Sequence, residues 1–406
     1  MALPRDLRYL ARSAHFHYLV NSFTILRRAL MATATRPVSP NAVYPADAVS
    51  RLFAPPETEV PALKLRRLLH EARDKGTFLH TAGAYDAFTS AIMTRLGFNA
   101  LYGSGWQLAA TKSMYPDIGI YQSHQMVELV LEMKKGIEGA RNAAWFDSDG
   151  KELLPAPPAF VDMEAGFGGP TQTFTLATEL IRVGAAGVHL ENQDPSNRTC
   201  GHIVNVGKQK RNKVLVPRKD WLAKLKAIKG AADATGVEVV IIARTDSIDG
   251  ALPDQEPGGV KMAIEDAWEA AELGVDVIWP EFNNVELDQP QEFAEGVRRY
   301  YPNQMLGFNL SPSLYFGKAK KAGTLITNQQ LADLGFTLQF STLFNFRTAG
   351  MALEKGLRKF LASGLDALAD LQIEEDAQEQ APITKMHQKF AGMNRWLVLE
   401  QVLSGK

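Results

Sequence analysis

The chain has 406 residues, of which 46% are hydrophobic and 22% charged, the balance of a folded globular protein, and this excludes a largely disordered chain. The formal net charge of −1 gives no general attraction to nucleic acid or to an anionic membrane, and no run of about 18 apolar residues is present that would span a bilayer. With one cysteine the chain cannot form an internal disulfide, which fits a reducing compartment such as the cytoplasm.

The first 60 residues are expected to form an N-terminal arm outside the folded domain. Residues 1–40 carry six arginines and a single acid, Asp6, and a segment rich in arginine and poor in acids is typical of an organellar transit peptide. If residues 1–30 are such a peptide, the compartment is the mitochondrial matrix and not the cytoplasm. A disordered or partner-binding arm, or a chain that starts at Met31, explains the same residues equally well.

From Leu63 onward one sequence pattern recurs. An amphipathic segment ends at a glycine, and a short apolar run follows that closes on a polar residue. These apolar runs lie at 77–83, 95–105, 159–165, 182–193, 237–247, 272–282, 305–313 and 333–343. Eight strands that alternate with helices predict an α/β fold, a (β/α)8 TIM-type barrel over residues 61–350. An open, doubly wound sheet is the alternative, but it more often has a glycine-rich phosphate loop after its first strand, and TAGAYD is not one.

Residues 351–406 are predicted to form a C-terminal helical region after the barrel. Within it, the acidic segment LQIEEDAQEQAP at 371–382 is interpreted as a solvated linker. The last segment, FAGMNRWLVLEQVL at 390–403, is apolar enough to pack against another subunit.

The polar residues that end the predicted strands are unusually acidic. A TIM barrel carries its active groups at the carboxyl ends of its strands, so these residues are expected to meet at one rim. In chain order they are Asp86, Ser104, Asp162 with Glu164, Glu191 with Gln193, Arg244 with Asp246, Glu281, Asn309 with Ser311 and Ser313, and Thr342. Carboxylates gathered at one rim repel one another unless a cation lies between them, and oxygen ligands favour Mg²⁺, or Mn²⁺, over zinc.

A metal site is therefore expected at this rim. Its direct ligand is predicted to be Asp162, and its water-mediated ligands are predicted to be Asp117, Glu164, Glu191 and Glu281. For each single acid, capping of the next helix or pairing with Arg244 is an equally good interpretation. A hard metal at such a site binds a substrate that offers oxygens of its own, typically a 2-hydroxy or 2-oxo acid, and Arg244 would bind a carboxylate of that substrate.

The only cysteine, Cys200, lies in the polar stretch SNRTCGHIVNVGKQKRN. A lone cysteine is more often a small core residue, but the flanking Arg198, Gly201 and His202 leave little to bury here. The two basic neighbours are expected to lower the pKa of the thiol, so that it acts as a nucleophile or as a proton donor. A thiol on the face opposite the metal can protonate the carbanion that remains when a carbon–carbon bond of a hydroxy acid breaks.

These motifs together resemble those of the isocitrate lyases. RTCGH at 198–202, followed by KVLVP at 213–217, is similar to the KKCGH loop that carries the catalytic cysteine in that family. Eight further blocks match in the same order, at 104–107, 115–117, 161–169, 187–193, 242–246, 279–281, 309–313 and 339–343. The wider superfamily includes 2-methylisocitrate lyases, phosphonopyruvate-forming mutases and oxaloacetate hydrolases.

The resemblance implies a Mg²⁺-dependent lyase of the glyoxylate cycle that cleaves isocitrate to glyoxylate and succinate. The metal would be held directly by Asp162 and, in the outer shell, by Asp117, Glu164 and Glu191. The substrate would be bound by Ser104, Gly105, Trp106, Gly201, Arg244, Asn309, Ser311, Ser313 and Thr342. Cys200 would protonate the succinate carbanion with the help of His202 and Glu281. The family further implies a homotetramer that exchanges C-terminal helices between subunits.

The chain departs from the family pattern in several places. Arg198 and Thr199 replace the two lysines before the cysteine, which removes one cation from the loop. An insertion occupies 203–212, and Leu190 stands where isocitrate lyases usually carry tryptophan. Pro280 resembles the residue of methylisocitrate lyases at that point.

Three other functions are compatible with parts of this pattern. A 2-methylisocitrate lyase, which gives pyruvate and succinate, would use the same chemistry on a substituted acid. A Cys–His acyl hydrolase would form a covalent acyl-enzyme without metal, but the acidic strand ends have no role in that reaction. A non-catalytic relative would serve as a subunit or binding protein, although Cys200, Asp162 and Glu191 are all retained.

Overall fold

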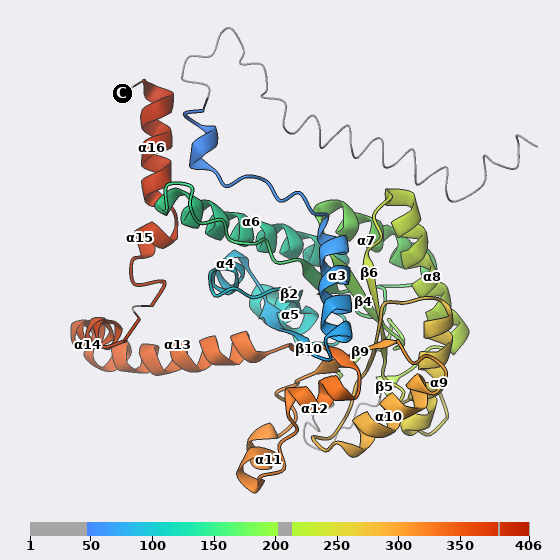
Figure 1. Ribbon diagram of the computed structural model, residues 1–406. Coiled ribbons are helices and arrows are strands. Elements are labelled where there is room, and N and C mark those ends of the chain that lie inside the picture. Colours follow the sequence, from blue (N-terminus) through green and yellow to red (C-terminus); the bar gives the residue numbers. More distant parts are fainter. Residues whose placement is uncertain (1–46, 202–212, 381, 406) are drawn as a thin grey trace, which may run out of the picture. The chain divides into compact units, whose positions relative to one another are not determined.

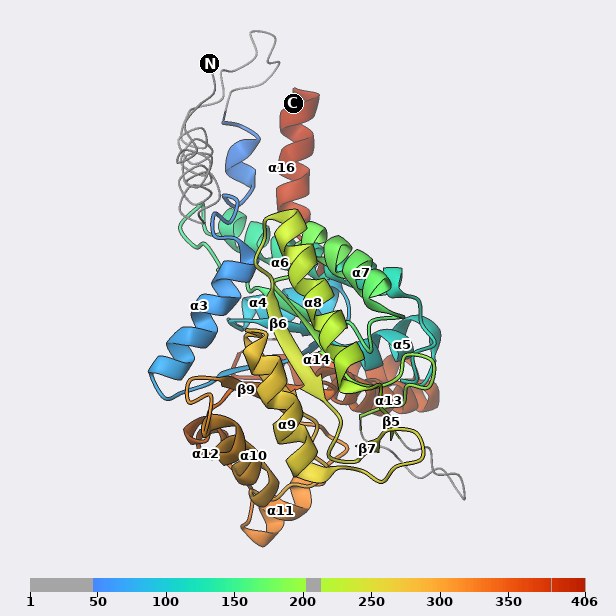
Figure 2. The same cartoon turned by 90° about the vertical axis from the view of Figure 1, so that its right-hand side faces the viewer.

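The structure is a computed structural model that describes residues 47–201, 213–380 and 382–405 (Figures 1 and 2). Its backbone contacts define two units, one of residues 52–397 and one whose described parts are residues 47–51 and 398–405. Most of the predicted N-terminal arm, together with His202 and the insertion at 203–212, lies outside the described residues. Among the residues that are described, no helix is long and apolar enough to cross a membrane.

Strands and helices alternate along most of the chain. The strands are β1 (Leu79–Ala84), β2 (Leu101–Gly103), β3 (Ala159–Asp162), β4 (Gly187–Glu191), β5 (Lys213–Val214), β6 (Val240–Thr245), β7 (Gly250–Ala251), β8 (Val277–Pro280), β9 (Met305–Asn309) and β10 (Phe336–Ser341). The helices before β8 are η1 (Ser50–Leu52), α3 (Pro61–Asp74), α4 (Ala87–Arg95), α5 (Gly105–Ser113), α6 (Ser123–Asp147), α7 (Pro170–Val183), α8 (Arg218–Thr235) and α9 (Gly259–Glu272). Those after β8 are α10 (Asp288–Arg298), α11 (Phe316–Ala322), α12 (Asn328–Asp333), α13 (Phe344–Ser363), α14 (Leu365–Asp376), α15 (His387–Phe390) and α16 (Met393–Ser404).

Eight parallel strands close into a barrel in the order β1-β2-β3-β4-β6-β8-β9-β10. The ring closes because β1 pairs in parallel both with β2, where Gly83 lies opposite Tyr102, and with β10, where Leu79 lies opposite Leu338. The predicted (β/α)8 barrel is thus confirmed, and each predicted strand segment contains or overlaps one barrel strand. The open-sheet alternative is wrong, since an open sheet would leave β1 or β10 with an unpaired edge.

Large side chains fill the inside of the barrel. Tyr102, Trp279 and Phe340 come from three different strands, with ring centroids 4.9 Å apart for Tyr102–Phe340 and 4.8 Å apart for Trp279–Phe340. Leu65 and Leu69 of α3 belong to the same buried cluster, and both are 0% exposed. Since α3 packs its apolar face onto the interior residues, it covers one end of the barrel and leaves the carboxyl ends of the strands for chemistry.

The other barrel helices lie outside the strands. In Figure 2, α7, α8 and α9 follow one another along the outer surface near β6. Gly184 ends α7 with a φ of 105°, and Gly335 precedes β10 with a φ of 99°, left-handed conformations that favour glycine. These are two of the glycines that the repeated sequence pattern placed between helix and strand.

The chain after β10 is helical. Figure 1 shows α13 leading from β10 to α14. The interpretation of 371–382 as a linker is wrong for its first half, because α14 continues to Asp376. The linker interpretation rested on the three consecutive acids at 374–376. Leu368 and Leu371, however, are three residues apart, a spacing that fits one face of a helix.

Candidate active site

A small cavity opens at the carboxyl ends of the barrel strands. Its volume is about 30 Å³, enough to hold a water molecule. The residues that line it are Tyr102, Ser104, Trp106, Asp117, Asp162, Arg198, Cys200, Gly201, Arg244, Glu281, Asn309, Ser311, Ser313, Thr342 and Leu343.

Most residues predicted for the site are therefore brought together. The predicted residues outside the cavity lining are Gly105, Glu164 and Glu191, which are all buried, and His202, which lies outside the described residues. Asp86 does not contribute: its carboxylate accepts a hydrogen bond from the Thr89 N–H at 2.7 Å and caps α4. Asp86 follows β1 at the rim, as predicted, but it caps the next helix and does not line the cavity.

Asp162 ends β3 and is 4% exposed. Its two oxygens accept hydrogen bonds from the Gly105 N–H at 3.2 Å and from the Glu164 N–H at 2.7 Å. A Cβ added to Gly105 would lie 2.4 Å from Glu164 Oε1 and 2.8 Å from Asp162 Oδ2, so only glycine allows the start of α5 to approach the carboxylates this closely. Glu164 itself adopts a φ of 51°, an uncommon conformation for a residue with a side chain.

The side chain of Arg198 lies among the carboxylates of the site, although the sequence placed it only near the thiol of Cys200. Its guanidinium forms ion pairs with Asp117, Glu164 and Glu191, and the Nε–Oε1 distance to Glu191 is 2.7 Å. Arg198 is 2% exposed, and the three carboxylates hold its pKa well above the ordinary value although burial opposes this. Sequence reasoning missed this position, because Arg198 was read only as a neighbour of Cys200.

The donor set fits a hard divalent cation. Asp117, Asp162, Glu164 and Glu191 offer only oxygen, and the buried Glu164 Oε1 lacks a hydrogen-bond partner among the described residues. Two cations lie against these carboxylates: Arg198 pairs with three of them, and Arg244 pairs with Glu191. No three acidic, histidine or cysteine side chains of the described chain are arranged to ligate one ion directly.

Burial sets the protonation of these acids in the metal-free protein. It raises the pKa of Glu191 to about 7 and that of Glu164 well above the ordinary value, although Arg198 opposes both shifts. Burial would also raise the pKa of Asp162, but neighbouring cations and the Glu164 N–H outweigh it and the pKa is lowered. His189 contributes most to this lowering, because its own pKa, which burial lowers to about 4, leaves it charged in the acidic range where Asp162 titrates and neutral at pH 7.

Protein stripped of divalent cations is expected to lose stability as the pH rises from about 5 to about 8. The folded pKa values of Glu164 and Glu191 lie above the ordinary 4.5, so this stabilising contribution is complete below pH 4.5 and, for Glu191, disappears as the pH rises through about 7. For Glu191 alone the loss in the free energy of unfolding is on the order of 3 kcal/mol. Asp162 titrates below this window because its pKa is lowered.

Urea unfolding in EDTA across this pH range measures the effect. The same series with Mg²⁺ is expected to show a flatter profile, since the cation then balances the carboxylates. Metal-free stability that rises between about pH 5 and 8 would contradict the expectation.

Arg244 also lines the cavity, and its neighbours hold its guanidinium in place. Arg244, at the end of β6, contacts both oxygens of Asp246, at 2.9 and 3.0 Å, and its guanidinium carbon lies 4.5 Å from the Trp279 ring centroid. Lys213 Nζ lies 2.9 Å from Asp246 Oδ1, and both side chains are fully buried. Arg244 is also 3.3 Å from Glu191, which links it to the carboxylate cluster. This arrangement presents a rigid cation to an anionic ligand.

The segment with the cysteine packs directly on this arginine. A Cβ at Gly201 would lie 2.4 Å from Arg244 Nη2 and 3.0 Å from Glu281 Oε1. Glu281 Oε1 also accepts a hydrogen bond from Asn309 Nδ2 at 3.1 Å. The partly buried Cys200 therefore lies next to the point where the 194–201 segment packs on Arg244 and Glu281, and it lines the same cavity as Asp162.

His189 lies within β4, under the site. Its Nε2 is 2.9 Å from the Tyr102 hydroxyl and 3.5 Å from Asp162 Oδ1. His189 has no other histidine or cysteine at the spacing that metal ligands show in a sequence. In the structure it is a buried, hydrogen-bonded core residue.

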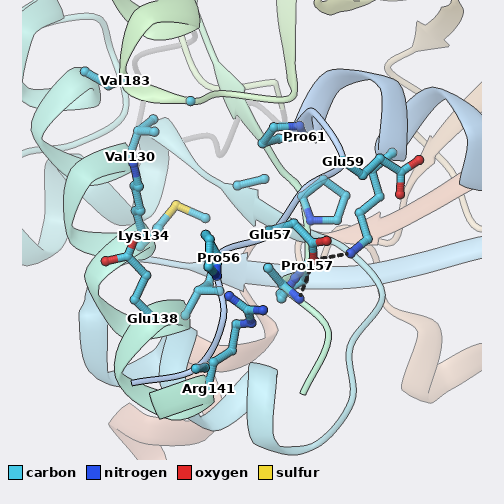
Figure 3. A pocket seen from close by; sticks show the side chains of 18 of the residues that line it. Pro56, Glu57, Glu59, Pro61, Val130, Lys134, Glu138, Arg141, Pro157 and Val183 are labelled. Atoms are coloured by element: carbon cyan, nitrogen blue, oxygen red, sulfur yellow. Dashed lines mark hydrogen bonds and ion pairs between the residues drawn. The ribbon is translucent and has the colours of Figure 1, made fainter. Parts of the chain in front are cut away.

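A larger cavity, of about 520 Å³, lies elsewhere in the same unit (Figure 3). It involves Ala159, where β3 begins, and so lies toward the amino ends of the strands. Figure 3 shows Glu57, Glu138 and Arg141 among prolines and aliphatic side chains there. It shares no lining residue with the carboxylate site, so its size is no guide to the chemistry.

A closed parallel barrel with buried carboxylates, an arginine and a thiol at its carboxyl rim is the architecture of a TIM-barrel enzyme. Residues 65–359 match the family described as phosphoenolpyruvate phosphomutase. The chain is 33% identical over 319 residues to isocitrate lyase of Escherichia coli, with 70% of each chain covered. It is 29% identical over 371 residues to isocitrate lyase of Halalkalibacterium halodurans, which covers 85% of this chain and 84% of the relative. The protein belongs to the phosphoenolpyruvate mutase/isocitrate lyase superfamily, and it is a carbon–carbon lyase.

Solved structures show the same fold. Oxaloacetate acetylhydrolase in complex with the inhibitor 3,3-difluorooxalacetate superposes with a TM-score of 0.64 at 23% identity, over 86% of this chain and 98% of that chain. The trigonal crystal form of 2,3-dimethylmalate lyase superposes with a TM-score of 0.63 at 20% identity, over 85% of this chain and 95% of that chain.

Proposed function

We propose that this protein is a Mg²⁺-dependent isocitrate lyase that produces glyoxylate and succinate in the glyoxylate cycle. The observation that carries the proposal is that Cys200, Asp162 and Arg244, which come from distant parts of the chain, line one buried cavity. Similarity to isocitrate lyases over most of the chain supports the same substrate class. The expected compartment is the cytoplasm, or the mitochondrial matrix if residues 1–30 are a transit peptide.

The carboxylates would hold the metal on one side of the cavity. Asp162 is the proposed direct ligand, and Asp117, Glu164 and Glu191 are proposed to act through water. Bound Mg²⁺, or Mn²⁺, would supply a Lewis acid for the hydroxyl and carboxylate oxygens of the substrate. The glyoxylate part would lie near Ser104, Gly105 and Trp106, where the N-terminus of α5 and its N–H groups favour negative charge.

The other residues would bind and protonate the succinate part. Its carboxylate would contact Asn309, Ser311, Ser313 and Thr342, and Gly201 and Arg244 would contact the substrate from the thiol side. When the carbon–carbon bond breaks, the hydroxyl gives its proton to a carboxylate of the site, and its oxygen becomes the glyoxylate carbonyl. The electron pair of that bond stays on the succinate carbon, to which Cys200 donates a proton, assisted by Glu281 and His202.

The second candidate is cleavage of 2-methylisocitrate to pyruvate and succinate. Pro280 follows the buried Trp279 at the end of β8, and this residue pair resembles methylisocitrate lyases. An additional methyl group in a pocket changes binding by about 1–3 kcal/mol, so the two substrates are separable by specificity.

Competition between the two acids tests the substrate. With Mg²⁺ present and both acids at equal concentration, kcat/KM for isocitrate is expected to be at least about tenfold higher, measured as glyoxylate against pyruvate. A ratio that favours the methyl compound would replace the first function by the second. Full activity in EDTA would contradict both and favour an acyl hydrolase.

We further propose that the enzyme is a homotetramer in which α13 and α14 pack against another copy of the chain. Neither Leu357, which is 63% exposed, nor Leu361, which is 89% exposed, is covered within the described residues, and Leu365 of α14 is 78% exposed. An apolar helix face of this extent is normally buried against a partner. The exchange of C-terminal helices that the family implies provides such a partner.

Leu357→Asp is expected to dissociate the oligomer, because it places a charge in the centre of this face. Lys355→Asp on the same helix is the matched control, since positions two residues apart lie on opposite faces. Light scattering after size-exclusion chromatography measures the mass of each variant. A parent enzyme that elutes as a monomer would contradict the proposed assembly.

A further inference from the structure

We propose that Arg198 is a resident cation of the metal site, which holds Asp117, Glu164 and Glu191 together and anchors the Cys200 segment before any divalent ion binds. The reference to a metal rests on the proposed function. The anchoring of the segment does not, and it is tested without metal or substrate.

The contacts of Arg198 join three separate parts of the chain. Asp117 follows α5, Glu164 lies in the turn after β3, and Glu191 ends β4. One planar guanidinium spans all three, because it presents five N–H donors in a fixed fork, whereas an ammonium group is a single point charge. With 2% exposure the group is shielded from water, so these ion pairs are not weakened by solvent as surface pairs are.

Arg198 is also well fixed within its own segment. The following N–H, of Thr199, donates to Gln193 Oε1 at 3.0 Å, and the Asn197 N–H donates to the Asp194 carbonyl at 3.1 Å. A Cβ at Gly119 would lie 3.5 Å from the Arg198 Cβ, so the arginine stem packs closely on the 117–121 loop. Because Arg198 precedes Cys200 by two residues, holding this side chain in the carboxylate cluster determines where the thiol lies.

The charge of Arg198 has a second consequence. Ionised carboxylates of the cluster attract a divalent ion, but a positive group within the cluster repels that ion. Arg198 is therefore a positioning residue that stabilises the metal-free site and weakens metal binding. A neutral side chain at position 198 removes both the stabilisation of the metal-free site and the repulsion of the metal ion. Lysine keeps the positive charge but lacks the forked N–H donors of the guanidinium.

Reaction of the only cysteine with a thiol reagent tests the anchoring. In EDTA, Cys200 of Arg198→Met is expected to react at least about tenfold faster than in the parent, because the segment opens more often. Arg198→Lys is expected to react about threefold faster, and it decides the test if the methionine variant does not fold. Arg67→Met is the matched control, since Arg67 joins Glu59 and Glu71 on the surface, and it should react at the parent rate. Parent-rate reaction of the folded Arg198 variants would overturn the proposal.

Binding of Mn²⁺, followed by electron paramagnetic resonance of the free ion, tests the charge effect. Arg198→Met is expected to bind Mn²⁺ at least about tenfold more tightly near pH 8, while Arg198→Lys stays within about threefold of the parent. Arg198→Lys is thus expected to bind Mn²⁺ about as the parent does, while its Cys200 still reacts faster than the parent thiol. A variant that had lost its fold would not show this combination. Unchanged or weaker binding by Arg198→Met would overturn the charge effect. A parent that binds no Mn²⁺ would instead contradict the proposed function, and the thiol rates would still decide the anchoring.

Discussion

Replacement of Cys200 by serine is expected to lower kcat for isocitrate cleavage by about 10²–10⁴-fold, the range of a lost general acid. The ordinary pKa of a thiol is about 8.5, whereas a serine hydroxyl does not titrate in the physiological range, so serine is a poor proton donor to a carbanion. The two side chains have nearly the same shape, and Cys200 lies at the cavity wall and not in the apolar core. The fold and the affinity for Mn²⁺ should therefore stay at the parent level.

Single-turnover kinetics with Mg²⁺, together with Mn²⁺ titration and thermal unfolding, measures these quantities. Ser196→Ala is a suitable control, because it changes a hydroxyl in the same segment that only bonds Asp194 on the surface. Cleavage by Cys200→Ser at the parent rate would remove the proposed role of the thiol.

Replacement of Asp162 by asparagine is expected to weaken Mn²⁺ binding by at least about 100-fold and to abolish measurable turnover. The change removes the negative charge of the proposed direct ligand. It retains an oxygen that can accept from the Gly105 N–H or the Glu164 N–H, so the turn after β3 should keep its shape. In EDTA near pH 8 the variant is expected to be less stable than the parent, because the lowered pKa of Asp162 means that the folded site favours the charged carboxylate.

Asp86→Asn provides the matched control at another barrel rim position. Asparagine is as good a helix N-cap as aspartate, and Asp86 caps α4, so the metal affinity and the turnover should not change. Calorimetric titration with Mn²⁺ measures both variants. If Asp162→Asn binds the ion as tightly as the parent, the ligand lies elsewhere in the site.

The eight barrel strands were predictable because their signals are local. A run such as VEVVIIARTDS contains its own strand pattern, and a glycine such as Gly184 marks the end of the preceding helix within a few residues. The acidic character of the rim was predictable for the same reason, since Asp162 and Glu191 each end their own strand. The acidic segment 371–382 shows the limit of this reasoning. Its dense charge indicates a solvated linker, but α14 continues through its first half to Asp376.

The sequence by itself determined the closed barrel and the chemical groups at the ends of its strands, because hydrophobic periodicity and helix-ending glycines act over a few residues. Only the tertiary structure decided which of those groups meet: Asp86 turns to its own helix, whereas Asp117, which ends no strand, lies at the cavity with Asp162. Likewise Arg198 pairs with Asp117, Glu164 and Glu191, at separations along the chain that no local pattern encodes. Ion pairing depends on distance through space, and that distance exists only once the barrel has closed.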